Sequence, residues 1–259
     1  MPHPDIQSLR DELAPVFDVY GALTLLSWDQ EVNMPPKGAE ARGRQLATLS
    51  SIAHRMFTDS KIGDLLKKLR DTKGLSEDEQ KLVSETWHDY DHATKLPEKF
   101  VSRFTEATSK AFQAWIQAKK NADFAVFRPH LETLVGLCRE KADLIGFEGS
   151  PYNALLDEYE RGMTAEQLRP MFAELAERQS ALIARIVKSP NQADLAWLKG
   201  EWDTKQQWDF TLRLLRDMGY DFEAGRQDHS EHPFTTDFDL CDVRVTTHCY
   251  PDQLIPGFS

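Results

Sequence analysis

A succession of amphipathic helical patterns constrains this chain more than any other feature. Over roughly the first 220 of 259 residues, apolar side chains recur three or four positions apart, which is the spacing of one helix face. Helices are predicted over residues 9–26, 39–70 with a break near 58–60, 76–95, 98–120, 124–146, 165–188 and 203–218. Pro15 is expected to kink or split the first of them. The chain is therefore predicted to be mainly α, with one continuous domain over 1–259.

Several helix starts and stops are marked by single residues. Met34–Gly38 contains two consecutive prolines, which lack backbone donors and disfavour helix in the residue before them, so a helix should end there. Ser76 is followed three positions later by Glu79, and Thr164 by Gln167. This spacing is that of a capping box, in which each side chain accepts from a backbone N–H at the helix start. The two boxes predict where two of the helices begin.

The pattern changes after Gly219. Residues 234–238 and 242–247 alternate in polarity and are rich in β-branched side chains, which predicts two short strands. Two strands alone form a marginal sheet, so they should pack on helices or pair with a strand that the sequence does not make obvious. The chain is therefore expected to be helical over 1–220 and to carry a small β-hairpin or sheet within 221–259.

Charge and composition exclude several classes of partner. The formal net charge is −11, and residues 201–259 hold 5 basic against 12 acidic residues. This balance argues against nucleic acid or an anionic membrane as the main partner. No apolar run approaches the roughly 20 residues that cross a bilayer, and the N-terminus lacks the basic and apolar regions of a secretory signal. The three cysteines are far apart and odd in number, which fits a reducing compartment, so a soluble cytoplasmic protein is expected.

His88-Asp-Tyr-Asp-His92 is the sharpest local pattern. Histidines four positions apart on a helix share one face and can both reach a single zinc ion. The acid after the first histidine is Asp89, which is one methylene shorter than the glutamate of a zincin and would misplace a general base. An ordinary amphipathic surface helix is the simpler interpretation. A zinc hydrolase built on His88 and His92 is kept as an alternative, in which His88→Ala would abolish metal binding.

Three further clusters have both a chemical and a structural interpretation. His229 and His232 lie between a helix and a strand, where two histidines need not converge on a metal. The acidic run 157–161 is either a substrate-facing patch or a solvated helix end, and the second is favoured. Residues 28–31, Trp-Asp-Gln-Glu, would place a carboxylate in a pocket under an aromatic lid, although Trp at helical spacing usually belongs to the core. The sequence contains no G-x-S-x-G, P-loop or G-x-G-x-x-G motif.

Arg244 lies within the second predicted strand, where a charge must face water, an ion partner or a ligand. The planar guanidinium suits bidentate recognition of a carboxylate. Asp242 is its neighbour two residues away on the same face, so an ion pair between the two is the structural alternative. Residue chemistry alone leaves both interpretations open.

Five stretches of the chain resemble the Taq-type (thermostable) metallocarboxypeptidases. In chain order they are Leu25–Pro35 with W-D-Q…M-P, Asp89–Pro97, Tyr152–Glu160 with Y-x-x-L-L-D-x-Y-E, His232–Thr235 with H-P-F, and Asp242–Thr247 with D-x-R-x-T-T. The five stretches occur in the same order as in that family and are spread over nearly the whole chain, which makes the resemblance specific. No single motif would do so.

The resemblance implies a multi-helical zincin-type peptidase that removes C-terminal residues from peptides, usually as a homodimer. It implies that the H-P-F and D-x-R-x-T-T motifs line the active-site cleft. Position by position, His232 and Phe234 would then shape its wall, and Arg244, in the same motif as Asp242, would bind the substrate's free carboxylate. The family often has Arg after the paired threonines, where this sequence has His248, so a second carboxylate contact is left open.

The family's zinc ligands, an H-E-x-x-H helix and a downstream Glu, follow the D-x-R-x-T-T strand. This sequence contains no H-E-x-x-H motif. The chain is therefore expected to be the N-terminal part of a larger metallocarboxypeptidase, without catalytic or metal-binding residues of its own and inactive alone. The alternative is a non-catalytic helical protein, descended from that enzyme, which binds peptides or dimerises.

Overall fold

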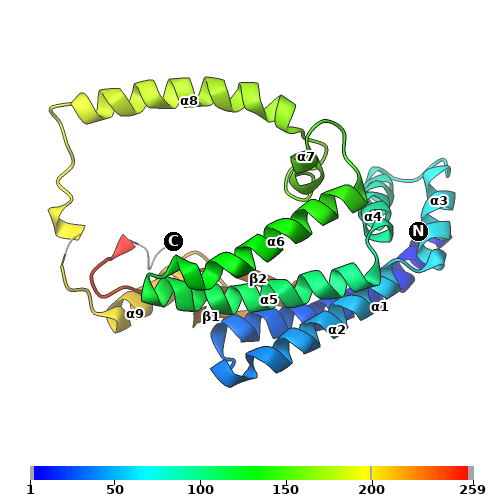
Figure 1. Ribbon diagram of the computed structural model, residues 1–259, viewed down its shortest axis with the longest axis horizontal. Coiled ribbons are helices and arrows are strands. Elements are labelled where there is room, and N and C mark those ends of the chain that lie inside the picture. The colour runs from blue at the N-terminus through cyan, green and yellow to red at the C-terminus, as the bar shows by residue number, and fades with distance from the viewer. Residues whose placement is uncertain (1–2, 199, 256–259) are drawn as a thin grey trace. The chain divides into compact units, whose positions relative to one another are not determined.

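The computed structural model describes residues 3–198 and 200–255 (Figure 1). Its contacts divide the chain into two compact units, the first of Met1–Ile145 with Thr236–Asp242 and the second of Gly146–Thr235 with Val243–Ser259. The prediction of a mainly helical chain with a small sheet near its C-terminus is confirmed. The interpretation as one continuous domain stays a prediction.

The first unit holds six α-helices within its described residues, and each matches a predicted helical stretch. They are α1 (Pro4–Val32), α2 (Ala39–Phe57), α3 (Ser60–Arg70), α4 (Glu77–Lys95), α5 (Glu98–Asn121) and α6 (Phe124–Ile145), with a short 3₁₀ turn η1 (Pro36–Gly38) after α1. The predicted break in 39–70 is present, because Asp59 caps α3 by accepting from the Lys61 N–H at 2.9 Å. The capping box of Ser76 and Glu79 opens α4 as predicted.

Pro15 does not split α1, which continues unbroken from Pro4 to Val32. That part of the prediction is wrong. A proline inside a helix removes one backbone donor, and the carbonyl left without a partner can be solvated when the proline faces water. Pro15 is exposed, so the helix continues past it.

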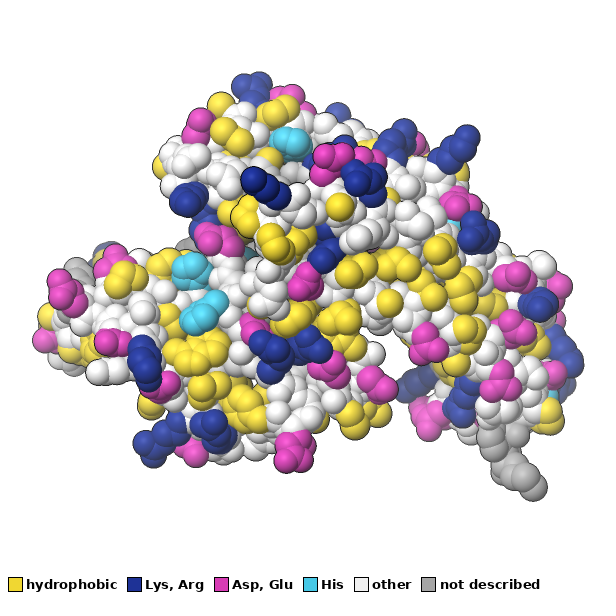
Figure 2. Space-filling view, turned by 90° about the horizontal axis from the view of Figure 1, so that it is seen from below, with side chains coloured by type: hydrophobic (Ala, Val, Ile, Leu, Met, Phe, Trp, Pro, Cys, Tyr) yellow, Lys and Arg dark blue, Asp and Glu magenta, His cyan; other side chains and the backbone are white. Residues whose placement is uncertain are grey.

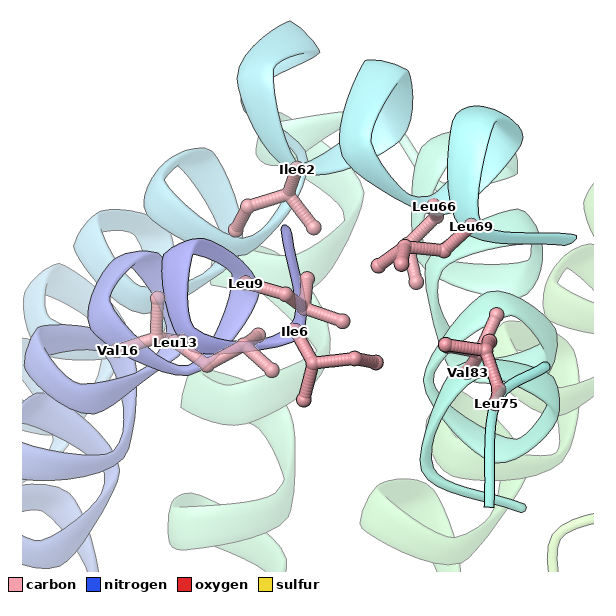
Figure 3. Close-up of a cluster of buried hydrophobic side chains, with 9 residues drawn as sticks. All are labelled: Ile6, Leu9, Leu13, Val16, Ile62, Leu66, Leu69, Leu75 and Val83. Carbon is pink, nitrogen blue, oxygen red and sulfur yellow. The ribbon is translucent and has the colours of Figure 1, made fainter. Parts of the chain in front are cut away.

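An apolar core joins α1, α3 and α4 of the first unit (Figure 3). Helix α2 packs on α1 and α5, α5 packs on α6, and α3 packs on α1 and α4. Nine buried side chains from α1, α3, α4 and the loop before α4 form the core: Ile6, Leu9, Leu13, Val16, Ile62, Leu66, Leu69, Leu75 and Val83. The predicted spacing of three or four residues thus becomes contact between neighbouring helices.

The second unit contains the remaining helices. They are α7 (Pro151–Leu156), α8 (Ala165–Lys188), the 3₁₀ turn η2 (Ala196–Leu198) and α9 (Thr204–Asp217). The capping box of Thr164 and Gln167 opens α8 as predicted. The short helix α7 was not predicted, because six residues show too little periodicity to mark a helix.

The sheet has three strands in the order β1-β3-β2, where β1 is Gly225–His229, β2 is Thr235–Asp239 and β3 is Asp242–Thr247. The two predicted strands are β2 and β3. The third, β1, pairs parallel to β3 with Gly225 opposite Val243 and His229 opposite Thr247. Its sequence, GRQDH, has no β-branched residue, which is why the pattern did not reveal it. A Cβ on Gly225 would lie 2.1 Å from the Val243 carbonyl oxygen, so only glycine fits there.

Charged side chains of both signs are interspersed over the face of the molecule that Figure 2 displays. No large basic surface of the kind that binds nucleic acid is visible on that face. Within the described residues, no helix combines the length and the apolar character needed to cross a membrane.

Candidate substrate-binding site

The H-P-F segment forms the wall of a small pocket in the second unit. His232, Pro233, Phe234 and Thr235 line it together with Thr246 of β3, and its volume is about 320 Å³. Two of the four predicted substrate-binding residues, His232 and Phe234, are therefore on one pocket. The other two, Asp242 and Arg244, are not among the described residues that line it.

Thr246 fixes the backbone of this segment by several hydrogen bonds. Its hydroxyl accepts from the Phe234 N–H at 2.8 Å, and its own N–H donates to the Phe234 carbonyl at 2.9 Å. The Ser230 hydroxyl lies 2.7 Å from the Thr246 hydroxyl and 2.7 Å from the His232 carbonyl oxygen. Ser230 and Thr246 are each only 6% exposed. Because buried hydrogen bonds hold its backbone at several points, the segment presents the His232 and Phe234 side chains in a fixed position.

Sequence reasoning did not single out Ser230 or Thr246 individually. The available signal was the paired threonine of the D-x-R-x-T-T motif, because a hydroxyl at a buried strand position needs a partner. Thr246 finds that partner in the backbone of the H-P-F segment. Phe234 and Thr246, which are 12 residues apart in sequence, thus join the two motifs into one structural feature.

His248 stands where the family often has arginine, and its ring contacts other residues of the second unit. Its Nδ1 lies 2.8 Å from the Ser230 carbonyl oxygen. A carbonyl only accepts, so Nδ1 carries the proton and donates. The ring also packs on Tyr250 with 4.3 Å between centroids. Whether this position supplies a second carboxylate contact stays open, as it did in the sequence.

Arg244 lies in the middle of β3 and is half-buried. Its register partner on β1 is Arg226, whose guanidinium is bound by Asp228 with Nε 2.7 Å from the carboxylate oxygen. The charge of Arg226 is therefore already compensated by a residue of its own strand. Binding of a substrate carboxylate by Arg244, and the alternative ion pair with Asp242, both stay predictions.

His229 is not among the described residues that line the pocket of His232. His229 ends β1 and its ring packs on Trp208 with 4.1 Å between centroids, whereas His232 lines the H-P-F pocket. The acidic run that follows α7 lies on a turn, where Asp157 accepts from the Gly162 N–H at 2.8 Å. Residues 158–161 of that turn are exposed, which favours the solvated interpretation.

His88 and His92 are brought together on α4, as their spacing predicted. Both are half-buried, and their ring centroids are 4.3 Å apart. Asp89, between them in sequence, is exposed. Helix α4 thus supplies two imidazoles, whereas a catalytic zinc site takes three protein ligands and a water. A zinc hydrolase built on this pair stays an alternative. It predicts that the His88→Ala variant no longer binds metal, which a metal-binding assay of that variant would test.

Comparison with known proteins places these motifs in one family. Residues 8–259 match the family described as Carboxypeptidase Taq (M32) metallopeptidase. The chain belongs to the M32 carboxypeptidase family. The resemblance found in the five motifs is therefore confirmed over nearly the whole M32 chain.

Relatives of known name and structure agree with this assignment. The M32 chain is 37% identical over 245 residues to thermostable carboxypeptidase 1 of Thermus thermophilus and 34% identical over 227 residues to carboxypeptidase 1 of Bacillus subtilis. These matches cover 90% and 87% of this chain but 48% and 45% of the relatives. The solved structure "BsuCP Crystal Structure" has a TM-score of 0.93 at 31% identity, covering 99% of this chain and 52% of that one. The chain thus spans about half the length of the relatives it matches.

The M32 family is one of metallopeptidases, so a metal ion is implied for its members. The residues that line the H-P-F pocket do not fit such an ion. They offer one imidazole, from His232, beside Pro233, Phe234 and two threonines. A catalytic zinc ion takes three ligands drawn from His, Cys, Asp and Glu, so this pocket is not a zinc centre.

Proposed function

We propose that this chain forms the substrate-binding half of a metallocarboxypeptidase and receives the C-terminal end of a peptide. The observation that carries the proposal is the H-P-F pocket, whose backbone is tied to the D-x-R-x-T-T strand through Thr246. An apolar wall held by β3, with the Arg244 guanidinium on that strand two residues before Thr246, suits a terminal side chain and a terminal carboxylate. The M32 relationship and the half-length match support it.

Each residue then has a stated task. The guanidinium of Arg244 would bind the two oxygens of the substrate's terminal carboxylate, which fixes the end of the peptide. The ring of Phe234 would exclude water from the side of the terminal residue, and His232 would shape the opposite wall. Asp242 would restrain Arg244 from two residues away. Orientation of this kind contributes to rate by holding the scissile bond in one place.

The metal is proposed to be zinc, which in such enzymes polarises the peptide carbonyl and activates a water molecule. The residues that line the H-P-F pocket do not fit a zinc ion. We therefore propose that the 259-residue polypeptide alone does not hydrolyse a blocked dipeptide. Turnover of such a dipeptide by the purified polypeptide, with more than about half an equivalent of bound zinc, would refute this.

A homodimer in the cytoplasm is proposed as the state of the whole enzyme. The resemblance to the Taq-type family supports the dimer. The free cysteines of the described chain, Cys138, Cys241 and Cys249, support a reducing compartment. Sedimentation equilibrium of the endogenous protein would test the first proposal, and its localisation in fractionated cells the second.

The substrate-end proposal is tested by comparing two ligands that differ only at the C-terminus. An N-blocked dipeptide with a free carboxylate and its C-terminal amide are titrated into the chain and followed by NMR. We expect the acid to bind at least about ten-fold more tightly, since a charge-assisted bidentate pair is lost in the amide. Arg244→Gln should remove that preference.

Arg213→Gln is the matched control, because Arg213 is an exposed arginine on α9 of the same unit, within 3.6 Å of Asp217. It should leave the preference for the acid unchanged. Equal affinity of the wild-type chain for acid and amide, or a preference that survives Arg244→Gln, would contradict the proposal.

A further inference from the structure

A second pocket lies within the first unit, beside the Trp-Asp-Gln-Glu segment of α1, and its volume is about 330 Å³. Its apolar walls come from three helices: Leu23 on α1, Leu46 on α2, and Phe104 and Phe112 on α5. Sites for small molecules are typically of roughly 300–1,000 Å³ and apolar, with a few polar groups that orient the ligand. This pocket is at the small end of that range.

The hydroxyl and amide groups on its walls are already engaged with the protein. Ser109 donates to the Gln30 side-chain oxygen at 2.7 Å, and the Thr105 hydroxyl lies 3.1 Å from that of Ser50. The Ser27 hydroxyl donates to the Leu23 carbonyl at 3.1 Å, and that of Thr108 to the Phe104 carbonyl at 3.0 Å. These groups therefore do not make the pocket select for a particular ligand charge.

Glu31 is different, because it is the one charged residue among the described residues that line the pocket. It is half-buried and makes no hydrogen bond or ion pair with any residue in 3–198 or 200–255. Asp29, two residues earlier, is bound by Arg42 with Nη2 2.6 Å from the carboxylate. The two carboxylates of the Trp-Asp-Gln-Glu segment thus differ: the protein compensates one and leaves the other facing a cavity.

Leaving a carboxylate partly desolvated without a partner costs free energy, which a cation would offset. Burial raises the pKa of Glu31 above its ordinary value, in agreement with that cost. The faces of Phe104 and Phe112 add an apolar surface that also attracts cations. The Lys141 ammonium already lies 5.5 Å from the Phe104 ring centroid, so the carboxylate rather than that ring is the group that needs a positive charge.

We propose that this pocket binds a small organic cation with an apolar body, whose ammonium group pairs with Glu31 and whose body packs against Phe104 and Phe112. A free amine and the side chain of a lysine in a bound peptide share this chemistry. The proposal does not depend on the substrate-end proposal, since it concerns other residues in the other unit.

The test uses 2-phenylethylamine and its neutral counterpart 2-phenylethanol, titrated into the full chain and followed by NMR. The amine is expected to bind at least ten-fold more tightly than the alcohol. Glu31→Gln should remove this preference, because the ligand loses its counter-charge. Glu40→Gln, at an exposed carboxylate of α2 that pairs with Arg44, should retain it.

A second variant keeps the test decisive if Glu31→Gln unfolds the chain. Thr108 is an exposed wall residue, so Thr108→Trp should be tolerated by the helix and should fill the pocket, weakening both ligands at least ten-fold. Titration with Nα-acetyl-lysine amide distinguishes the source of the cation. If this compound binds and the binding depends on Glu31, the natural ligand is a lysine side chain of a peptide. If it does not bind although 2-phenylethylamine does, the natural ligand is a free amine. No binding of 2-phenylethylamine, equal binding of amine and alcohol, or binding that survives Thr108→Trp would overturn the proposal.

Discussion

Helices α3 and α8 carry the same kind of amphipathic pattern but differ in what their apolar side chains contact. In α3, Leu66 is fully buried in the core that it forms with α1 and α4. In α8, no described side chain is buried, and Leu182 and Val187 are 51% and 71% exposed. The difference shows that apolar spacing predicts a helix and its apolar face, whereas it does not predict whether this chain covers that face.

The largest loss of stability is expected from a substitution in the core that α3 forms with α1 and α4. Leu66→Ala should lower the free energy of unfolding by about 2–5 kcal/mol, because it removes buried methyl groups and leaves a cavity. Urea denaturation followed by circular dichroism measures the change. A loss below about 1 kcal/mol would mean that the core of the first unit is not packed as described.

A smaller effect is expected where polar groups, rather than apolar ones, hold the structure together. Thr246→Val should cost about 1–3 kcal/mol, since it leaves the partly buried Phe234 N–H without its acceptor and removes one of the two contacts of the Ser230 hydroxyl. Thr235→Val, at an exposed position of the same pocket, is the matched control and should change stability little. Equal effects of the two substitutions would show that Thr246 does not hold the H-P-F segment.

Stability should also depend on pH through Glu31. Burial raises the pKa of Glu31 in the folded chain above its ordinary value of 4.5, so the folded state holds the proton more tightly than the unfolded state. The stability that this group contributes is therefore complete below pH 4.5 and is lost as the pH rises through the folded pKa. Glu31→Gln should become more stable than the wild type over that rise, whereas Glu40→Gln should not. If the free energies of unfolding of the wild type and of Glu31→Gln differed by the same amount at every pH, this prediction would be contradicted.

The smallest effect is expected in α8. Leu182→Ala is the same substitution as Leu66→Ala, yet it should change the free energy of unfolding by no more than about 0.5 kcal/mol, because the side chain is already in water. Parallel urea titrations of the two variants compare the helices directly. A cost for Leu182→Ala near that of Leu66→Ala would mean that α8 is covered in solution.

The same contrast explains how much of the fold could be predicted. The helices and both capping boxes follow from local spacing and local chemistry, which act within one turn of chain. Strand β1 could not be predicted, because Gln227 and Asp228 are buried through long-range pairing with β3 and not through their own hydrophobicity. Similarly, α1 continues past Pro15 because Pro15 faces water, and a local sequence pattern does not show which side of a helix faces water.

The candidate site was predictable to the extent that it lies in motifs. His232 and Phe234 come together on one pocket because they are neighbours in the H-P-F segment. Ser230 and Thr246 act through contacts across the sheet, so their role required the structure. The sequence of the Trp-Asp-Gln-Glu segment suggested that one of its carboxylates lies in a pocket, but it did not say which. The structure shows that Glu31 lines a pocket and that Arg42 binds Asp29.

We propose above that this chain works as half of a metallocarboxypeptidase, and the intact mass of the endogenous protein tests that proposal most directly. The chain has a mass of 29.7 kDa and spans 45–52% of the length of the relatives compared above. Mass spectrometry of the protein isolated from its source cells should therefore give about twice 29.7 kDa. A mass of 29.7 kDa, with no second polypeptide that copurifies, would contradict the claim and would favour a peptide-binding protein without catalysis.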